Sequence, residues 1–322
     1  MCMERLKNII RLNYIFAKEA FYFYRFQKKY NASCSTHRDI KKFQYAISKM
    51  VHTIEKGMTL RYVRKGFGQE KVIRIIRELN IYKELYFEDD PSFLDYPLSV
   101  IDAYINYQKN NGVNIDEIES LYGKLSGNRR SKNKAGTITL KKEDILSVCD
   151  KNYESLLYSR HSMRYFDDEE VPDSIILKAL KFAQRTPSAC NRQGWLTHVF
   201  RYPQSIELSR WQGGCRGFEE EIKCAILVTA NRKAFFSHEV FQAYIDGGLY
   251  AMNLINAFHS LGLGCIPLSC GFNIEKLRRL KAFGIPDNEA PIIIIGVGNI
   301  PNEVKIAVSE RKDINETNIF HK

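Results

Sequence analysis

The stretch SRHSMRYF, residues 159–166, places two arginines and a serine at alternate positions. If this segment is extended, Arg160, Ser162 and Arg164 point to the same side of it. If it is helical, the two arginines lie four residues apart and still share one face. Two guanidinium groups and a hydroxyl on one side suit the binding of a phosphate group. The alternative is a basic strand whose charges are only solvated.

A second polar stretch, RTPSACNRQGW at residues 185–195, follows an expected helix. Pro187 cannot continue a helix, so the helix must end before it. Ser188, Asn191 and Gln193 then offer hydrogen-bond donors and acceptors on a loop that leads into an apolar run. The alternative is a polar turn that only connects a helix to a strand.

The elements that position these residues can be predicted from the apolar pattern of the second half. Short runs rich in β-branched residues at 195–200, 224–230 and 291–298 predict buried strands. A helix is expected after Pro172, and a long apolar helix is expected at about 240–261. A shorter helix beginning at Asn273 should follow it. Because helices and strands mix without strict alternation, we expect an α+β fold.

The first half predicts helices joined by short loops over residues 40–125. The polar, basic segment at 125–137 is the best linker, and it predicts two domains, 1–130 and 131–322. His52 and Glu55 share one helix face, but no second pair of this kind follows, so we expect no metal site. Residues 1–30 are both aromatic and cationic. They predict either a helix lying on an acidic membrane or a helix that packs its aromatic side chains on the protein.

Composition narrows the class of protein. The formal net charge of +11 over 322 residues favours anionic partners. Eight scattered cysteines without a CxxC pair indicate a reducing cytoplasm, and no signal peptide is expected. The helix at 240–261 contains too many polar residues to cross a bilayer. A nucleic-acid partner is not expected, because no recognised binding motif contains the aromatic and cationic residues.

Three stretches together resemble the nitroreductase family of flavoproteins. The first is RHSMRYFDDEEVP, followed by an expected helix and TPSACNRQGW. The second is DGGLYAMNLINAFHSLGLGCIPL, and the third is GVGNIPNEV, which is followed by Arg311. The similarity covers about residues 140–322. It implies an antiparallel-rich sheet flanked by helices, in a homodimer that binds one FMN at each of two interface sites. The stretch HTIEKGM…GFG, within about residues 40–70, resembles an extension found in nitroreductase-like proteins of bacterial polysaccharide loci.

The resemblance also implies roles for individual residues. Arg160 and Ser162 match positions that hold the flavin phosphate and ribityl chain, with His161 between them. Arg164 and Asn191 match groups at the pyrimidine edge of the ring and are the expected catalytic residues. The other expected cofactor-binding residues are Pro187, Ser188 and Gln193 on the loop, Pro267, Leu268 and Ser269 from the partner subunit, and Arg311 as a C-terminal phosphate ligand.

Three positions depart from the family pattern. Gly194 stands where the family usually has proline, and residues 268–270 replace an acidic residue before Gly271. Ser309 stands where a basic residue usually lies, two positions before the C-terminal arginine. Either Lys312 or Lys305 therefore completes the phosphate site, or that site is weaker.

The implied function is that of an FMN-dependent oxidoreductase. It would take hydride from NADH or NADPH and pass it to a small-molecule acceptor in two half-reactions. The flavin does this chemistry, and the protein supplies position and electrostatics. Arg164 would stabilise the charge that reduction places on the ring edge. Two alternatives stay open: a flavin-dependent oxidase or dehydrogenase of a polysaccharide-pathway intermediate, and a non-catalytic scaffold that contacts the membrane through residues 1–30. The expected location is the cytoplasm, with contact at the inner membrane face left open.

Overall fold

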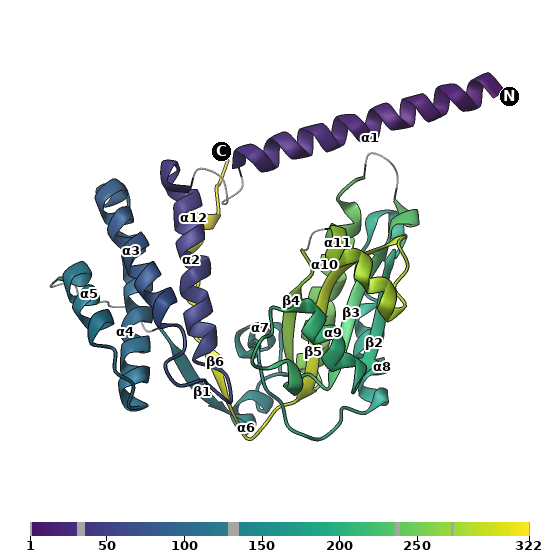
Figure 1. The fold of residues 1–322 in the computed structure, drawn as a ribbon. Helices are drawn as coiled ribbons and strands as arrows, with labels where there is room; N and C mark the ends of the chain where they lie inside the picture. Colours follow the sequence, from purple (N-terminus) through teal and green to yellow (C-terminus); the bar gives the residue numbers. More distant parts are fainter. Residues whose placement is uncertain (1, 31–35, 128–134, 236–238, 272–273, 322) are drawn as a thin grey trace. The chain divides into compact units, whose positions relative to one another are not determined.

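The computed structural model describes residues 2–30, 36–127, 135–235, 239–271 and 274–321 (Figure 1). The chain divides into two compact units. One unit comprises Met1–Tyr22 and Thr139–Val304, and the other comprises Phe23–Ile138 and Lys305–Lys322. These units differ from the predicted domains, 1–130 and 131–322, at both ends of the chain.

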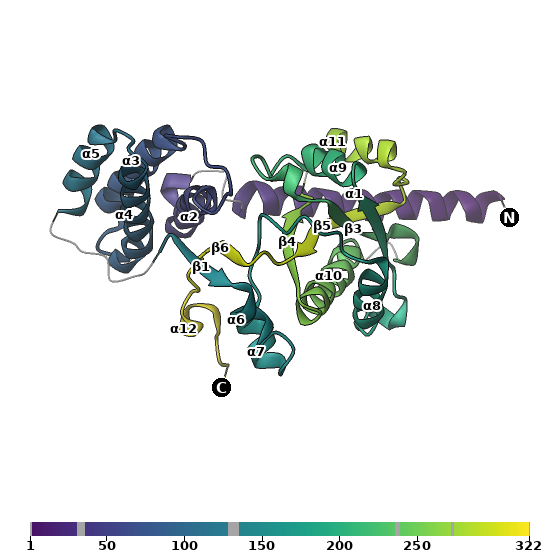
Figure 2. The same cartoon turned by 90° about the horizontal axis from the view of Figure 1, so that it is seen from below.

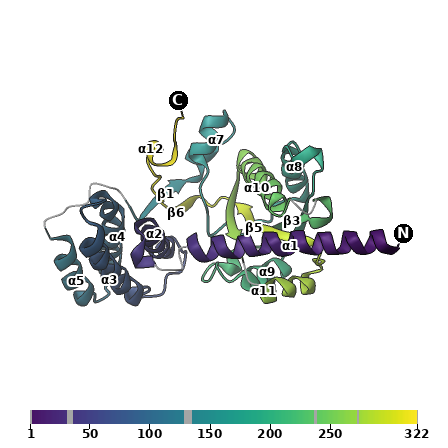
Figure 3. The same cartoon turned by 90° about the horizontal axis from the view of Figure 1, so that it is seen from above.

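The first unit is built on a four-stranded antiparallel sheet with the strand order β2-β3-β5-β4. The strands are β2 (Trp195–Arg201), β3 (Cys224–Asn231), β4 (Leu263–Ser269) and β5 (Glu289–Asn299). Figures 2 and 3 show helices on both faces: α8 (Asp173–Ala183) and α10 (Gln242–Ser260) on one, α9 (Gln204–Gln212) and α11 (Ile274–Arg278) on the other. This double cover explains why the central strand β3 is buried along nearly its whole length.

Helix α10 packs its apolar side chains on the sheet. Leu254 and Phe258 are fully buried, and Tyr250 stacks on Trp195 with ring centroids 4.8 Å apart. The opposite face of α10 also carries apolar side chains, and these are exposed within one chain. Its exposed residues are Tyr244, Ile245, Leu249 and Met252.

Short elements complete this part of the chain. They are α6 (Lys142–Leu146), α7 (Tyr153–Ser159) and the 3-10 turns η3 (Ala189–Asn191), η4 (Glu219–Glu221), η5 (Arg232–Ala234) and η6 (Arg279–Phe283). A two-stranded sheet pairs β1 (Thr137–Lys141) with β6 (Glu303–Ala307). The expected start of a helix at Asn273 lies outside the described residues. The α+β fold and the antiparallel sheet are confirmed.

The second unit is helical. Its helices are α2 (Ile40–Gly57), α3 (Gln69–Tyr86), α4 (Asp95–Asn110), α5 (Asp116–Ser126) and α12 (Ile314–Thr317), with the 3-10 turns η1 (Thr36–Arg38) and η2 (Pro91–Leu94). Ile47, Ile76 and Leu79 are fully buried in its own hydrophobic core. The Asp39 side chain accepts a hydrogen bond from the Lys42 N–H at 3.0 Å and so begins α2.

Helix α1 (Cys2–Tyr30) is a single long helix (Figure 1). Among the helices of the described residues, none is long and apolar enough to cross a membrane.

Candidate functional site

The segment with the alternating cations is extended. Helix α7 ends at Ser159, and Ser162 then forms a parallel bridge with Cys265 of β4. The Met163 N–H donates to the Cys265 carbonyl at 2.9 Å. The structure therefore selects the extended alternative over the helical one, and the segment runs along the outer edge of β4. We call residues 160–164 the cationic segment.

Two facing glycines make room for this segment on the sheet. Gly264 of β4 and Gly298 of β5 are cross-strand partners. A Cβ atom at Gly264 would lie 2.6 Å from the Met163 Sδ, and one at Gly298 would lie 2.5 Å from the Phe166 Cβ. Side chains at either position would push the chain away from β4, so the absence of a Cβ fixes the path of the cationic segment.

Burial separates Arg164 from a merely solvated arginine. Its side chain is only 5% exposed, whereas Arg160 and Ser162 are half-buried. A guanidinium group loses hydration free energy when it is buried, and anionic or hydrogen-bonding groups must compensate for that loss. The alternative of solvated charges on a basic strand therefore does not describe Arg164.

The last turn of α10 fixes the beginning of the cationic segment. His259 is 2% exposed, and its Nε2 lies 2.8 Å from the Ser159 Oγ. Burial lowers the pKa of His259 to about 4, and the nearby positive charges of Arg160 and His161 act in the same direction. His259 is therefore neutral at pH 7. His259 was not predicted as a site residue, although a histidine in an apolar helix is a signal that the sequence contains.

The polar loop is held to α10 where it leaves α8. The Asn253 Nδ2 donates to the Thr186 Oγ1 at 2.7 Å, and the Ala189 N–H donates to the Asp246 Oδ2 at 3.1 Å. Asp246 is only 1% exposed. A carboxylate that accepts a backbone N–H in a buried place holds the loop firmly. Thr186, Asp246 and Asn253 were not predicted as supporting residues, because the loop sequence does not reveal its partners.

The loop has an unusual backbone. Cys190, Asn191 and Gln193 all have positive φ angles, of 50°, 55° and 48°. Residues with a Cβ rarely adopt this region, and such strain concentrates at functional sites. The Gln193 N–H donates to the Ser188 Oγ at 2.9 Å, and the Gln193 Nε2 donates to the Asn191 Oδ1 at 3.2 Å.

An ion pair next to this turn stabilises it. Arg192 donates to both carboxylate oxygens of Glu239, at 2.7 and 2.6 Å. The same guanidinium lies 5.1 Å from the ring centroid of Phe235 and donates to the Ala234 carbonyl at 2.8 Å. Fork-shaped pairing of this kind fixes both position and orientation. The loop is thus held on both sides of Asn191, which leaves the Asn191 side chain exposed.

The structure brings only part of the predicted site together within one chain. Pro267, Leu268 and Ser269 belong to β4, the strand that the cationic segment follows, and the Ser269 carbonyl accepts from the Gln212 Nε2 at 2.9 Å. The polar loop instead leads directly into β2, at the other edge of the sheet. From the cationic segment to β2 there are four strand spacings, which amount to roughly 19 Å.

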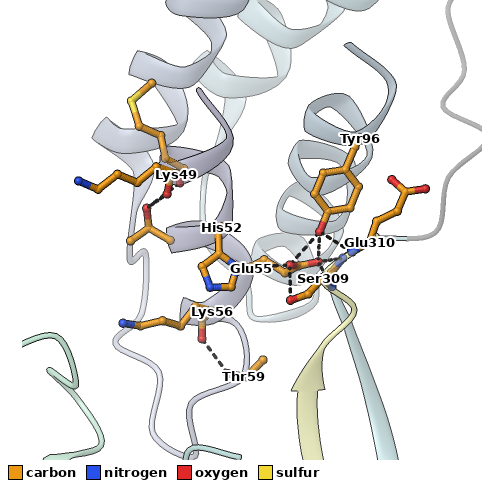
Figure 4. Close-up of polar contacts among 11 residues, drawn as sticks. Lys49, His52, Glu55, Lys56, Thr59, Tyr96, Ser309 and Glu310 are labelled. Carbon is orange, nitrogen blue, oxygen red and sulfur yellow. Dashed lines mark hydrogen bonds and ion pairs between the residues drawn. The ribbon is translucent and has the colours of Figure 1, made fainter. Parts of the chain in front are cut away.

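Arg311 lies in the other unit, so its assignment as a phosphate ligand stays a prediction. The residues around it have their own contacts there. The Lys312 Nζ lies 4.7 Å from the ring centroid of Tyr45. Ser309, with φ 48°, donates from its N–H and Oγ to the Glu55 carboxylate at 3.4 and 3.5 Å (Figure 4).

Glu55 is the centre of a buried polar cluster in the helical unit. It has no exposed surface, and it accepts a hydrogen bond from the Tyr96 Oη at 2.9 Å (Figure 4). It also accepts one from the Gly136 N–H at 3.2 Å. Burial and the Glu55 charge raise the pKa of Tyr96. The His52 Nδ1 lies 3.9 Å from the Glu55 Oε2. The described residues contain no group of ligands suited to a metal ion, and Glu55 serves instead to hold the C-terminal segment.

Comparisons with known proteins identify the family. The model of the nitroreductase family matches residues 157–241. A candidate NADH dehydrogenase/NAD(P)H nitroreductase from Methanothermobacter thermautotrophicus is 30% identical over 147 residues, which is 44% of this chain and 73% of that protein. A protein of the same description from Archaeoglobus fulgidus is 27% identical over 145 residues, 44% of this chain and 82% of that protein.

Two solved structures have similar folds. A candidate nitroreductase from Desulfovibrio desulfuricans, in complex with FMN, is 22% identical with a TM-score of 0.47, over 53% of this chain and 98% of that one. A nitroreductase family protein from Streptococcus pneumoniae is 21% identical with a TM-score of 0.45, over 53% of this chain and 100% of that one. On the match to the family model and the similarity to the Methanothermobacter protein, this chain belongs to the nitroreductase family.

Proposed function

We propose that the protein is an FMN-dependent oxidoreductase that accepts hydride from NADH or NADPH and reduces a small-molecule acceptor. The observation that carries this proposal is the buried Arg164, on an extended segment that also presents Arg160 and Ser162. Membership of the nitroreductase family supports the reaction class.

The donor set of these residues fits FMN. Two guanidinium groups and a hydroxyl suit a phosphate and a polyol chain, and the amides of Asn191 and Gln193 suit the edge of a pyrimidine ring. When bound, FMN supplies the hydride chemistry. Arg164 would supply a fixed positive charge where negative charge develops, and its burial strengthens that effect because water screens it less. The neutral His259 would hold Ser159, and thereby Arg160, in position.

We further propose that each site is completed by a second copy of the chain. Arg164 and Asn191 are both assigned to the same ring edge, so they must lie within a few ångströms of each other. Within one chain they belong to opposite edges of the sheet, roughly 19 Å apart. The cationic segment and Pro267–Ser269 would come from one subunit and the polar loop from its partner. This revises the expectation that Pro267–Ser269 come from the partner.

The exposed face of α10 supports this homodimer. Tyr244, Ile245, Leu249 and Met252 form a continuous apolar stripe on it, because they lie at helical spacing on one side. Gly248 lies between them, and no atom lies within 4 Å of the position its Cβ would take. Exposed apolar stripes of this kind mark protein interfaces.

We also propose a cytoplasmic location with peripheral contact at the inner membrane face. The basic net charge and the scattered cysteines support it. A role in polysaccharide biosynthesis is proposed on the resemblance of residues 40–70 alone.

Titration of apoprotein with FMN tests the cofactor assignment. We expect Arg160→Ala to weaken FMN binding about tenfold to a hundredfold, because a hydrogen bond to a charged group contributes roughly 1.5–3 kcal/mol. Arg164→Ala should instead lower the potential of the bound flavin more than it lowers affinity. Arg216→Ala, an exposed arginine of the same unit, is the matched control.

Three results would contradict the proposal. Unchanged FMN affinity in Arg160→Ala would show that this arginine does not hold the phosphate. An unchanged potential in Arg164→Ala would remove it from the ring edge. Bound flavin that neither NADH nor NADPH reduces would favour an oxidase or dehydrogenase, and a protein that binds no FMN would favour a non-catalytic scaffold.

A further inference from the structure

Helix α1 carries its cations in one row. Lys7, Arg11 and Lys18 follow one another at spacings of four and seven residues. At 100° per residue these positions fall within about 40° of one another around the helix. All three residues are exposed. In the sequence the same spacing continues at positions 25 and 29, which are arginine and lysine.

The opposite side of α1 is apolar. Ile9 and Phe16 lie about 140–180° around the helix from the three cations, and Leu6 lies beside them. Each of these side chains is roughly half exposed: Leu6 by 56%, Ile9 by 49% and Phe16 by 53%. Further exposed apolar side chains widen this face; they are Ile10, Leu12 and Tyr24. The exposed Tyr14 and Phe21 instead lie beside the cation row. The apolar face thus covers about half of the helix circumference, which is wider than a coiled-coil seam.

We propose that α1 lies in the plane of an anionic membrane surface, with the Leu6–Ile9–Phe16 face in the acyl boundary and the Lys7–Arg11–Lys18 row above the headgroups. It deepens the location proposed above, and it does not depend on the flavin chemistry. A helix with one basic face and one wide aromatic and aliphatic face is the type that binds at the membrane interface.

The charge and the dimensions of α1 favour an anionic membrane over other partners for its apolar face. Residues 4–18 contain Glu4 as their single acidic residue against four Lys and Arg, so an anionic surface complements them. A helix is about 10–12 Å across, and its apolar face would enter the boundary by about 5–10 Å. The cation row therefore stays within a Debye length, about 8 Å, of the lipid phosphates. Arg5 lies on the apolar side but at the first turn, where its long side chain can reach the headgroups.

Flotation of the full-length protein with vesicles tests the proposal. We expect the protein to float with vesicles that contain phosphatidylglycerol, to float much less with pure phosphatidylcholine, and to be released as salt rises. The triple variant Lys7→Gln, Arg11→Gln, Lys18→Gln should bind the anionic vesicles roughly a hundredfold more weakly, since each cation contributes about fivefold. Ile9→Ser with Phe16→Ser should also lose binding.

A matched control removes the same charge elsewhere. Lys71→Gln, Arg74→Gln, Arg77→Gln neutralises three exposed cations of α3 and should bind vesicles like the parent. If the control weakens binding as much as the α1 variant, only net charge matters and the proposal fails. The proposal also fails if the parent protein binds neither the anionic nor the phosphatidylcholine vesicles. It fails as well if the parent binds an oligonucleotide, used as an anionic competitor, but no vesicle.

A second copy as the occupant of the apolar face would give a different result. Light scattering would then show that Ile9→Ser with Phe16→Ser changes the oligomeric state, while the parent does not float with vesicles. NADH-driven reduction of bound flavin is measured on the same samples. Flotation without flavin reduction would sustain the membrane proposal and contradict the oxidoreductase proposal, and the reverse result would contradict only the membrane proposal.

Discussion

The buried His259 should make the first unit lose stability in mild acid. Its pKa lies at about 4 in the folded chain, below the ordinary value for histidine of about 6.5, because burial disfavours the charged imidazolium. Above pH 6.5 the residue is neutral in both the folded and the unfolded states and contributes no pH dependence. As pH falls below 6.5, the unfolded chain binds a proton that the folded chain does not, so stability falls until about pH 4. At pH 5 this amounts to a loss of about 2 kcal/mol relative to pH 7.

Tryptophan fluorescence measures this effect in the relevant unit alone. The chain has only two tryptophans, Trp195 and Trp211, and both belong to the unit that contains His259. Urea unfolding at pH 7 and pH 5 should show the loss in the parent. His259→Gln can keep a hydrogen bond to Ser159 but cannot titrate, so it should lose about 2 kcal/mol less over the same interval. His321→Gln, an exposed histidine, should behave like the parent. Equal pH dependence in the parent and in His259→Gln would refute the reasoning.

Two further substitutions test other parts of the structure. Glu55→Ala should destabilise the helical unit by roughly 3–5 kcal/mol, because the donors of Tyr96 and Gly136 lose their charged acceptor. Circular dichroism during thermal unfolding measures this loss. A loss no larger than that caused by Glu84→Ala, at an exposed position, would contradict the prediction. Gly298→Ala should lower the free energy of unfolding by roughly 1–3 kcal/mol, since the new Cβ would lie 2.5 Å from the Phe166 Cβ. Urea unfolding measures this loss. The control Gly271→Ala should show no such loss, because its Cβ would meet no atom within 4 Å.

Three of the four strands of the main sheet could be predicted from apolar runs rich in β-branched residues. The runs at 195–200, 224–230 and 291–298 correspond to β2, β3 and β5 within one or two residues, and the helix expected at 240–261 corresponds to α10. Strand β4 was missed because Pro267 interrupts its apolar run. A proline lacks the N–H that a central strand needs, but β4 is an edge strand, where proline is tolerated.

The candidate site also contains some residues that the sequence could suggest and others that it could not. Residue types and alternation were enough to propose Arg160, Ser162 and Arg164 as candidates, because an extended segment aligns every second side chain. The residues that hold the loop and the segment could not be found from spacing. Asp246 contacts a residue 57 positions away, and His259 contacts one 100 positions away. Such contacts depend on how α10 packs, and a single sequence does not contain that information.

The separation of the cationic segment and the polar loop at opposite sheet edges has a genetic consequence. If each site joins the segment of one chain to the loop of another, Arg164→Ala and Asn191→Ala damage different contributions to it. A mixed dimer of the two variants would then contain one site with both lesions and one site with none. Random pairing of equal amounts of two inactive chains would restore about a quarter of the parental sites, by the two-fold symmetry of such a dimer. Two alleles of this gene could therefore each fail alone and complement each other in one cell.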